Sequence, residues 1–142
     1  MIQLNTTKLA FYASNKDKIP PLSKSHVIYH YTCPGCSKSY VGKTDTTLYR
    51  RTEQHGWEQK ESAIFKHFSC CQGYQDIKNQ NLSSDNDEAR KTFQINTIRN
   101  NTIVLCSNNN WLTLAFLESL SIKELNPELN EGIKAAKKLY LF

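Results

Sequence analysis

Several cysteine and histidine side chains stand at spacings that suit a metal ion. Cys33 and Cys36 form a C-x-x-C pattern around a Pro-Gly dipeptide, and this tight turn directs both sulfur atoms towards one point, as in a zinc knuckle. Downstream, His67 and Cys71 are four residues apart, so on a helix they lie on one face. The chain has five cysteines, an odd number that argues against a closed set of disulfides. We expect Cys106 to be buried and inert.

A carboxylate and two basic side chains add a second kind of chemistry. Glu118 lies within an apolar run, where a carboxylate is costly unless it is paired or binds a metal ion; the alternative is that it lies at the edge of the apolar stripe, in water. Arg51 and His55 are four residues apart on one predicted helix and therefore share a face. A guanidinium can hold two phosphate oxygens, so this face suits a phosphate group. The alternative is a surface ion pair between an arginine and Glu53.

The elements that must position these side chains begin with a hairpin. Residues 26 to 31 are rich in β-branched and aromatic side chains and predict a strand. After a Pro-Gly turn, Ser39 to Lys43 predicts a second strand that pairs with the first. Tyr29 and Tyr40 lie on these strands, where tyrosine most often packs against the sheet. Gly42 follows, and a glycine at such a place lets another backbone approach closely.

The rest of the chain predicts helices, one further strand and polar connections. The predicted elements are helices at 47–55 and 62–68, a polar loop at 71–90, a strand at 93–97 and a helix at 111–125. Gly56 can end the first helix, and Asn126-Pro127 stops the last one. This order predicts an α+β domain with a small, mostly antiparallel three-stranded sheet flanked by helices. We divide the chain into a polar leader or linker at 1–25, the domain at 26–131 and a basic tail at 132–142.

Length, composition and charge bound the remaining possibilities. A chain of 142 residues fits one domain with a real core. No run approaches the ~18 apolar residues of a membrane span, and the start lacks the pattern of a signal peptide. We therefore expect no membrane partner and an intracellular, reducing location, which in a eukaryote is the nucleus. Residues 1 to 60 hold nine basic and four acidic side chains, whereas residues 61 to 142 hold nine of each. The basic half is either an ordinary solvated surface or one that attracts nucleic acid.

Taken together, these residues resemble the GIY-YIG nuclease family. Val27-Ile28-Tyr29 and Tyr40-Val41-Gly42 are similar to the two motifs that name the family, with Val27 and Val41 where the family has Gly and Ile. The later signals follow in the family's order: Leu48-x-x-Arg51 and His55 on the first helix, Leu117-Glu118 on the helix that presents a metal-binding glutamate, and Asn130 twelve residues after that glutamate. The resemblance covers residues 26 to 131 and implies the fold of that family.

A closer resemblance is to the GIY-YIG endonuclease domain of Penelope-like retroelements. The shared features are the Cys33-x-x-Cys36 pair between the two named motifs, the segment Ser62 to His67, and residues 129–142. Members of this group carry an intervening cysteine pair and histidines that are thought to bind zinc. The expected ligands of a structural Zn²⁺ are Cys33, Cys36, His67 and Cys71. His55 and Cys70 are alternatives for the fourth ligand.

The resemblance also implies a reaction, the hydrolysis or nicking of DNA phosphodiester bonds. Glu118 would hold one Mg²⁺ or Mn²⁺ ion, whose charge would stabilise the leaving 3′ oxygen. Arg51 would bind the scissile phosphate, assisted by Lys43. The remaining implied roles are proton transfer from the attacking water by either Tyr40 or His55, a hydrogen bond from Tyr29 to water or phosphate, and positioning near the glutamate by Asn130.

Two functions therefore compete at this point. The first is a metal-dependent DNA endonuclease of retroelement type, with a reverse transcriptase or a DNA-targeting domain supplied elsewhere. The alternative is a catalytically inactive, zinc-stabilised module that binds nucleic acid. The presence of both Arg51 and Glu118 favours the enzyme, because a decayed copy has no reason to keep both.

Overall fold

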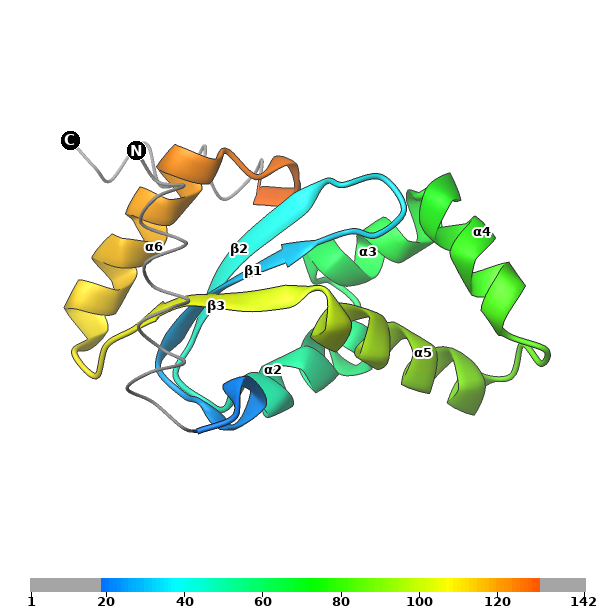
Figure 1. Ribbon diagram of the computed structural model, residues 1–142, viewed down its shortest axis with the longest axis horizontal. Coiled ribbons are helices and arrows are strands. Elements are labelled where there is room, and N and C mark those ends of the chain that lie inside the picture. Colours follow the sequence, from blue (N-terminus) through cyan, green and yellow to red (C-terminus); the bar gives the residue numbers. More distant parts are fainter. Residues whose placement is uncertain (1–18, 131–142) are drawn as a thin grey trace.

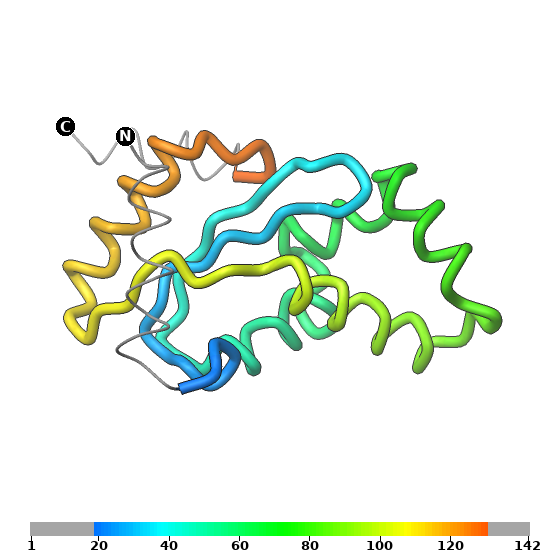
Figure 2. Tube along the Cα trace, in the orientation of Figure 1, coloured from blue at the N-terminus to red at the C-terminus, as the bar shows by residue number. Residues whose placement is uncertain are grey.

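A three-stranded antiparallel sheet organises the protein, whose residues 19 to 130 are described by a computed structural model. The strands are β1 (Val27–Thr32), β2 (Ser39–Thr44) and β3 (Thr102–Ser107), arranged in the order β2-β1-β3. The hairpin register places Tyr29 opposite Gly42, and β3 runs along the other side of β1 (Figures 1 and 2). The predicted α+β class, with a small, mostly antiparallel sheet of three strands flanked by helices, is confirmed.

Five α-helices flank this sheet within residues 19–130. They are α2 (Leu48–Glu53), α3 (Ala63–Cys70), α4 (Gln72–Asn81), α5 (Asp87–Asn100) and α6 (Trp111–Leu125), joined by the π-helical turn η2 (Gln54–Glu58) and the 3₁₀ turns η1 (Pro21–Ser23) and η3 (Glu128–Asn130). Each α-helix begins at a residue whose side chain accepts a backbone N–H bond, and the caps of α3 and α6 are Ser62 and Asn110. Within residues 19–130, no helix has the length and apolar character needed to cross a membrane.

The alternation of side chains along the strands produces two cores, one on each face of the sheet. Figure 1 shows α6 on one side and α2, α3 and α5 on the other. The α6 core contains Ile28 and Val41 from the sheet together with Leu114 from α6. The larger core on the opposite face contains Tyr29 and Tyr31 from β1 with residues of α2 to α5. The hairpin tyrosines therefore point away from α6.

The segment between the third helix and the last strand differs from the sequence prediction. The predicted loop at 71–90 contains α4 and the start of α5, and the predicted strand at 93–97 lies inside α5. Gln94, Ile95 and Ile98 are buried, which is a helical spacing rather than a strand alternation. Asn86 accepts from Ala89 N at 2.8 Å and begins this helix. The third strand is β3, built from the apolar residues after α5.

Gly56 does not end the first helix, because the chain continues through η2 to Glu58. A methyl group on Gly56 would approach Ile95 Cγ1 to 2.6 Å, so the glycine allows close packing against α5. Most of the predicted leader and all of the basic tail at 132–142 lie outside the described residues.

Candidate active site and metal centre

A buried polar network lies between β1 and the helical segment that follows β2. Arg51 Nε donates to Tyr29 Oη at 3.2 Å, and His55 Nε2 lies 2.7 Å from the same oxygen. On the other side of its ring, His55 Nδ1 lies 3.1 Å from Ser62 Oγ. The spacing of Arg51 and His55 predicted a shared face, and in the structure both side chains meet at one phenol. Ser62 is the N-cap residue of α3, and its contact with His55 joins that helix to the network.

Gly42 makes room for this phenol. Its position opposite Tyr29 in the hairpin brings the Tyr29 ring over the glycine, and a methyl group there would overlap the phenol and approach Tyr40 Cε1 to 2.8 Å. The predicted close approach at Gly42 is therefore made by a side chain and not by a backbone. The Tyr40 ring packs beside the network, with its centroid 5.4 Å from that of His55.

An open pocket of about 520 Å³ adjoins the network. Tyr40, Arg51, His55 and the chain from Glu58 to Ala63 line it. Arg51 Nη1 donates to Gln54 Oε1 and Gln59 Oε1, both at 2.9 Å, so the guanidinium is held at the pocket wall. The pocket therefore combines a fixed positive charge with a phenol and an imidazole.

The predicted alternative, a surface ion pair with Glu53, is formed by Arg50 and not by Arg51. Arg50 is exposed and pairs with Glu53 and Glu58. Because Arg50 and Arg51 are consecutive on α2, only one of them can face the sheet. That residue is Arg51, as its bond to Tyr29 requires.

Burial and the Arg51 charge set the protonation of the network. Burial, and secondarily the positive charge of Arg51, lower the pKa of His55 to about 3, so its imidazole is neutral near pH 7. Burial raises the pKa of Tyr29 above its ordinary value. Burial also raises the pKa of Tyr40, but the Arg51 charge opposes that rise. All three groups are therefore uncharged before any ligand binds.

Glu118 belongs to α6, on the opposite side of the sheet from α2 (Figure 1). It lies on α6 with only 8% of its surface exposed, so the alternative of a carboxylate in water is wrong. Burial is the largest cause that raises the pKa of Tyr29 and of Tyr40, and the negative charge of Glu118 raises both pKa values to a smaller extent. Its charge is therefore within electrostatic reach of both phenols. Four predicted site residues gather here, namely Tyr29, Tyr40, Arg51 and His55, and Glu118 acts on the two phenols through its charge.

Lys43 and Asn130 lie elsewhere. Lys43 alternates with Gly42 along β2 and so projects from the other face, where its Nζ lies 3.5 Å from the centroid of the Trp111 ring. Asn130 is buried at the outer edge of β2, where its side-chain amide both accepts from Val41 N and donates to Val41 O, each at 2.8 Å. Asn130 therefore fixes the strand that carries Tyr40 and does not enter the pocket.

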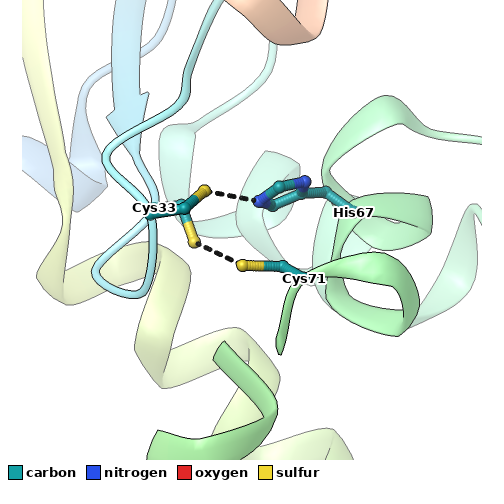
Figure 3. Close-up of side chains that lie close together, drawn as sticks. Cys33, His67 and Cys71 are labelled. Carbon is teal, nitrogen blue, oxygen red and sulfur yellow. Dashed lines mark hydrogen bonds between the residues drawn. The ribbon is translucent and has the colours of Figure 1, made fainter. Parts of the chain in front are cut away.

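The predicted zinc ligands form a second cluster at the far end of the hairpin. The metal-binding atoms of Cys33, Cys36, His67 and Cys71 all lie within 4.8 Å of one another. Cys36 Sγ is 3.2 Å from His67 Nε2, and the sulfur atoms of Cys33 and Cys71 are 3.9 Å apart. Figure 3 shows the Cys33, His67 and Cys71 side chains pointing towards one another from the hairpin turn and from α3. These four side chains could hold one metal ion.

The two alternative ligands lie outside this cluster. His55 belongs to the Tyr29 network, and Cys70 is exposed with its sulfur directed at the Lys66 carbonyl oxygen, 3.4 Å away. All five cysteines are free thiols. Cys106 was expected to be buried, but it is only partly buried.

Local structure explains how the hairpin turn reaches α3 and α4. Gly35 N donates to Cys33 Sγ at 3.4 Å, and a methyl group on Gly35 would come within 2.9 Å of Tyr74 Cα. Cys71 ends α3 and also caps α4, because its sulfur accepts from Tyr74 N at 3.4 Å. The glycines of the turn and of α4 thus allow two backbones to touch, a contact that sequence spacing does not indicate.

The thiols differ in their tendency to ionise. Burial raises the pKa of Cys33 to about 11. Burial also disfavours the Cys71 thiolate, but hydrogen bonds from the Tyr74 backbone and from neighbouring thiols outweigh that effect and lower the pKa of Cys71. A metal ion that binds thiolates would replace the proton of Cys33, and its affinity would therefore depend on pH. Three thiols and one imidazole form a donor set that fits Zn²⁺.

Comparisons of the chain with protein-family models, with curated proteins and with solved structures returned no match. The family resemblance therefore depends on the motifs and on the arrangement of the residues that they contain.

Proposed function

We propose that the protein is a metal-dependent endonuclease of the GIY-YIG type that hydrolyses phosphodiester bonds in DNA. The observation that carries this proposal is the convergence of Tyr29, Arg51 and His55 beside an open pocket, within electrostatic reach of the buried Glu118. Tyr29, Arg51 and His55 come from β1, α2 and η2, and packing alone does not require a phenol, a cation and an imidazole to meet. Perturbed groups in a cleft are typical of catalytic sites.

In this proposal Arg51 binds the scissile phosphate. Its guanidinium lines the pocket and is already oriented by Gln54 and Gln59, so little freedom is lost when a phosphate binds. The excess positive charge of residues 1 to 60 attracts the rest of the DNA backbone. Lys43 would contact DNA only outside the pocket, since it projects from the other sheet face.

Glu118 would hold the catalytic Mg²⁺ or Mn²⁺ ion. Mg²⁺ is commonly bound through one or two carboxylates, with water and substrate phosphate at its other positions, so a single buried carboxylate fits it. Within residues 19–130, the Cys/His cluster is the one grouping of three or more His, Cys, Asp or Glu side chains that could hold a metal. Glu118 does not belong to that grouping, so water and substrate phosphate would complete the coordination of the ion. When bound, the ion supplies charge that stabilises the leaving oxygen.

Of the two candidates for general base, we favour Tyr40 over His55. Tyr40 lines the pocket; burial raises the pKa of its phenol although the Arg51 charge opposes that rise, so its phenolate would form only when the bound metal ion adds a second positive charge. His55 has a pKa of about 3, and both of its ring nitrogens face hydroxyl groups of the protein, so it is a weak acceptor for a proton from water. His55 instead positions Tyr29, which would hydrogen-bond the attacking water or the phosphate.

We further propose that the Cys/His cluster binds a structural Zn²⁺ ion. Four protein ligands without an open position are typical of structural zinc, and they would join the hairpin turn to α3 and α4. Three ligating thiols must stay reduced, which favours an intracellular setting. Recognition of particular DNA sequences would come from a reverse transcriptase or another DNA-targeting domain.

Plasmid nicking by a matched pair of arginine variants tests the proposed function. Arg51→Lys keeps the charge but loses the fork that binds two phosphate oxygens, so we expect at least a hundredfold slower nicking in Mg²⁺, as for removal of one transition-state donor. Arg50→Lys, on the exposed side of the same helix, should nick at the wild-type rate. Equal rates for the two variants, or no nicking by the wild type, would exclude the proposed site.

A further inference from the structure

The charges around the open pocket suit an anionic ligand. The two carboxylates that line the pocket are each paired with a cation of the neighbouring surface, namely Glu58 with Arg50 and Glu61 with Lys66. The guanidinium of Arg51, by contrast, donates hydrogen bonds only to uncharged groups within residues 19–130. Its positive charge is therefore available to a ligand of the pocket. The hydroxyl group of Ser62 lies in the same wall.

The phenol of Tyr29 decides which nitrogen of His55 carries a proton. This phenol is 2% exposed, and its oxygen has two hydrogen-bond partners within residues 19–130. Arg51 Nε can only donate, so at 3.2 Å it uses the Tyr29 oxygen as an acceptor. The phenolic proton is then left with His55 Nε2, 2.7 Å away, because a buried hydroxyl proton without an acceptor is costly. Since the imidazole is neutral near pH 7, its single proton lies on Nδ1.

The protonated Nδ1 atom of His55 in turn determines what Ser62 can do. His55 Nδ1 donates to Ser62 Oγ at 3.1 Å, and Phe65 N donates to the same oxygen at 3.1 Å as the cap of α3. A serine hydroxyl has two lone pairs and one proton, so both of its lone pairs are occupied. Its proton has no acceptor within the part of the chain that the structure describes. Because Ser62 is only half-buried and lines the pocket, that proton is available to a ligand there.

We propose that Ser62 is a substrate-binding residue whose hydroxyl group donates a hydrogen bond to a DNA phosphate beside Arg51. The inference rests on the proposed nuclease function and adds a donor that lies outside the sequence motifs. Tyr29 cannot supply this donor, since its proton is directed to His55. The hydrogen bonds from Tyr29 to His55 and from His55 to Ser62 fix the direction of the hydroxyl before DNA binds. A donor that is already oriented needs no rearrangement when the phosphate arrives.

The first test measures the affinity of the full chain for a fluorescently labelled DNA duplex by anisotropy, with no added Mg²⁺ so that nothing is cleaved. Ser62→Ala removes the donor, Ser62→Thr keeps both the donor and the helix cap, and Ser69→Ala removes an exposed hydroxyl group from the same helix. We expect about tenfold weaker binding for Ser62→Ala, as for the loss of a hydrogen bond to a charged group, and wild-type affinity for the other two. Equal affinities of Ser62→Ala and the wild type would overturn the proposal.

Nitrogen NMR of the His55 imidazole supplies a readout that separates a substrate contact from a structural role. We expect the proton on Nδ1 in the wild type and also in Ser62→Ala, because Tyr29 still donates to Nε2. A proton on Nε2 in the wild type would overturn the proposal, since Ser62 would then donate to His55. A change of tautomer in Ser62→Ala would overturn it as well, since Ser62 would then act through the imidazole.

The same experiments distinguish this inference from the proposed nuclease function. If the wild type binds DNA through Ser62 but does not nick plasmid in Mg²⁺, the nuclease function fails and the Ser62 contact stands. If the wild type nicks plasmid and Ser62→Ala binds DNA equally well, the Ser62 contact fails alone. A wild type that neither binds nor nicks DNA would overturn both.

Discussion

The neutral His55 should make the folded protein sensitive to mild acid. Its imidazole is 1% exposed, and its folded-state pKa of about 3 compares with an ordinary value of 6.5. Below pH 6.5 the unfolded chain takes up a proton that the folded chain does not, so the free energy of unfolding falls as the pH decreases. The contribution of His55 is fully present above pH 6.5 and is lost progressively towards pH 3.

The slope follows from the two pKa values. One proton of difference corresponds to about 1.4 kcal/mol per pH unit, so the contribution lost between pH 6.5 and pH 4 is about 3 kcal/mol. Other groups titrate in this range, and burial lowers the pKa of His30 and His67 as well. A His55→Gln variant removes one titration and leaves these others in place. The difference between the two proteins therefore isolates His55.

Urea unfolding at pH 7, 6, 5 and 4 measures this difference. The variant should be less stable than the wild type at pH 7, because it loses the contacts of the ring with Tyr29 and Ser62. The gap should close by about 3 kcal/mol as the pH falls to 4. A gap that stays constant across this range would show that His55 titrates normally and would refute the reasoning from burial.

Three further changes test other parts of the structure. Gly42→Ala should displace the Tyr29 phenol, lower the free energy of unfolding by about 1–3 kcal/mol in urea and abolish nicking. Asn130→Ala should cost about 1–3 kcal/mol by the same measurement, because it leaves both backbone groups of Val41 without partners at a strand edge. Cys33→Ser should reduce the zinc content measured by atomic absorption to below half an ion per chain, while Cys106→Ser should leave it unchanged.

Local spacing in the sequence predicts much of the site. Arg51 and His55 meet because residues four apart share a helix face, and the Cys33 and Cys36 turn places its sulfurs together for an equally local reason. Glu118 was recognised from an apolar run that makes a carboxylate conspicuous. In each case a short segment contains the relevant geometry.

The remaining differences arise where distant segments meet. The alternation of Phe93, Ile95 and Thr97 resembles a strand over five residues, but packing on η2 and the Asn86 cap select the helix α5. Lys43 follows Gly42 in the sequence, yet the pleat of β2 sends it to the other face. No local signal connects Asn130 to the backbone of Val41 across the chain. Short alternating patterns and long-range contacts are therefore the parts that sequence alone predicts least well.

Metal-dependent cleavage by variants of α6 tests the central claim most directly. Glu118→Gln keeps the size of the buried side chain and removes its charge, whereas Glu124→Gln makes the same change at an exposed position of that helix. In the presence of Mg²⁺, supercoiled plasmid should be converted to relaxed circles by the wild type and by Glu124→Gln but not by Glu118→Gln. Nicking by Glu118→Gln at the wild-type rate, or none by the wild type, would contradict the account.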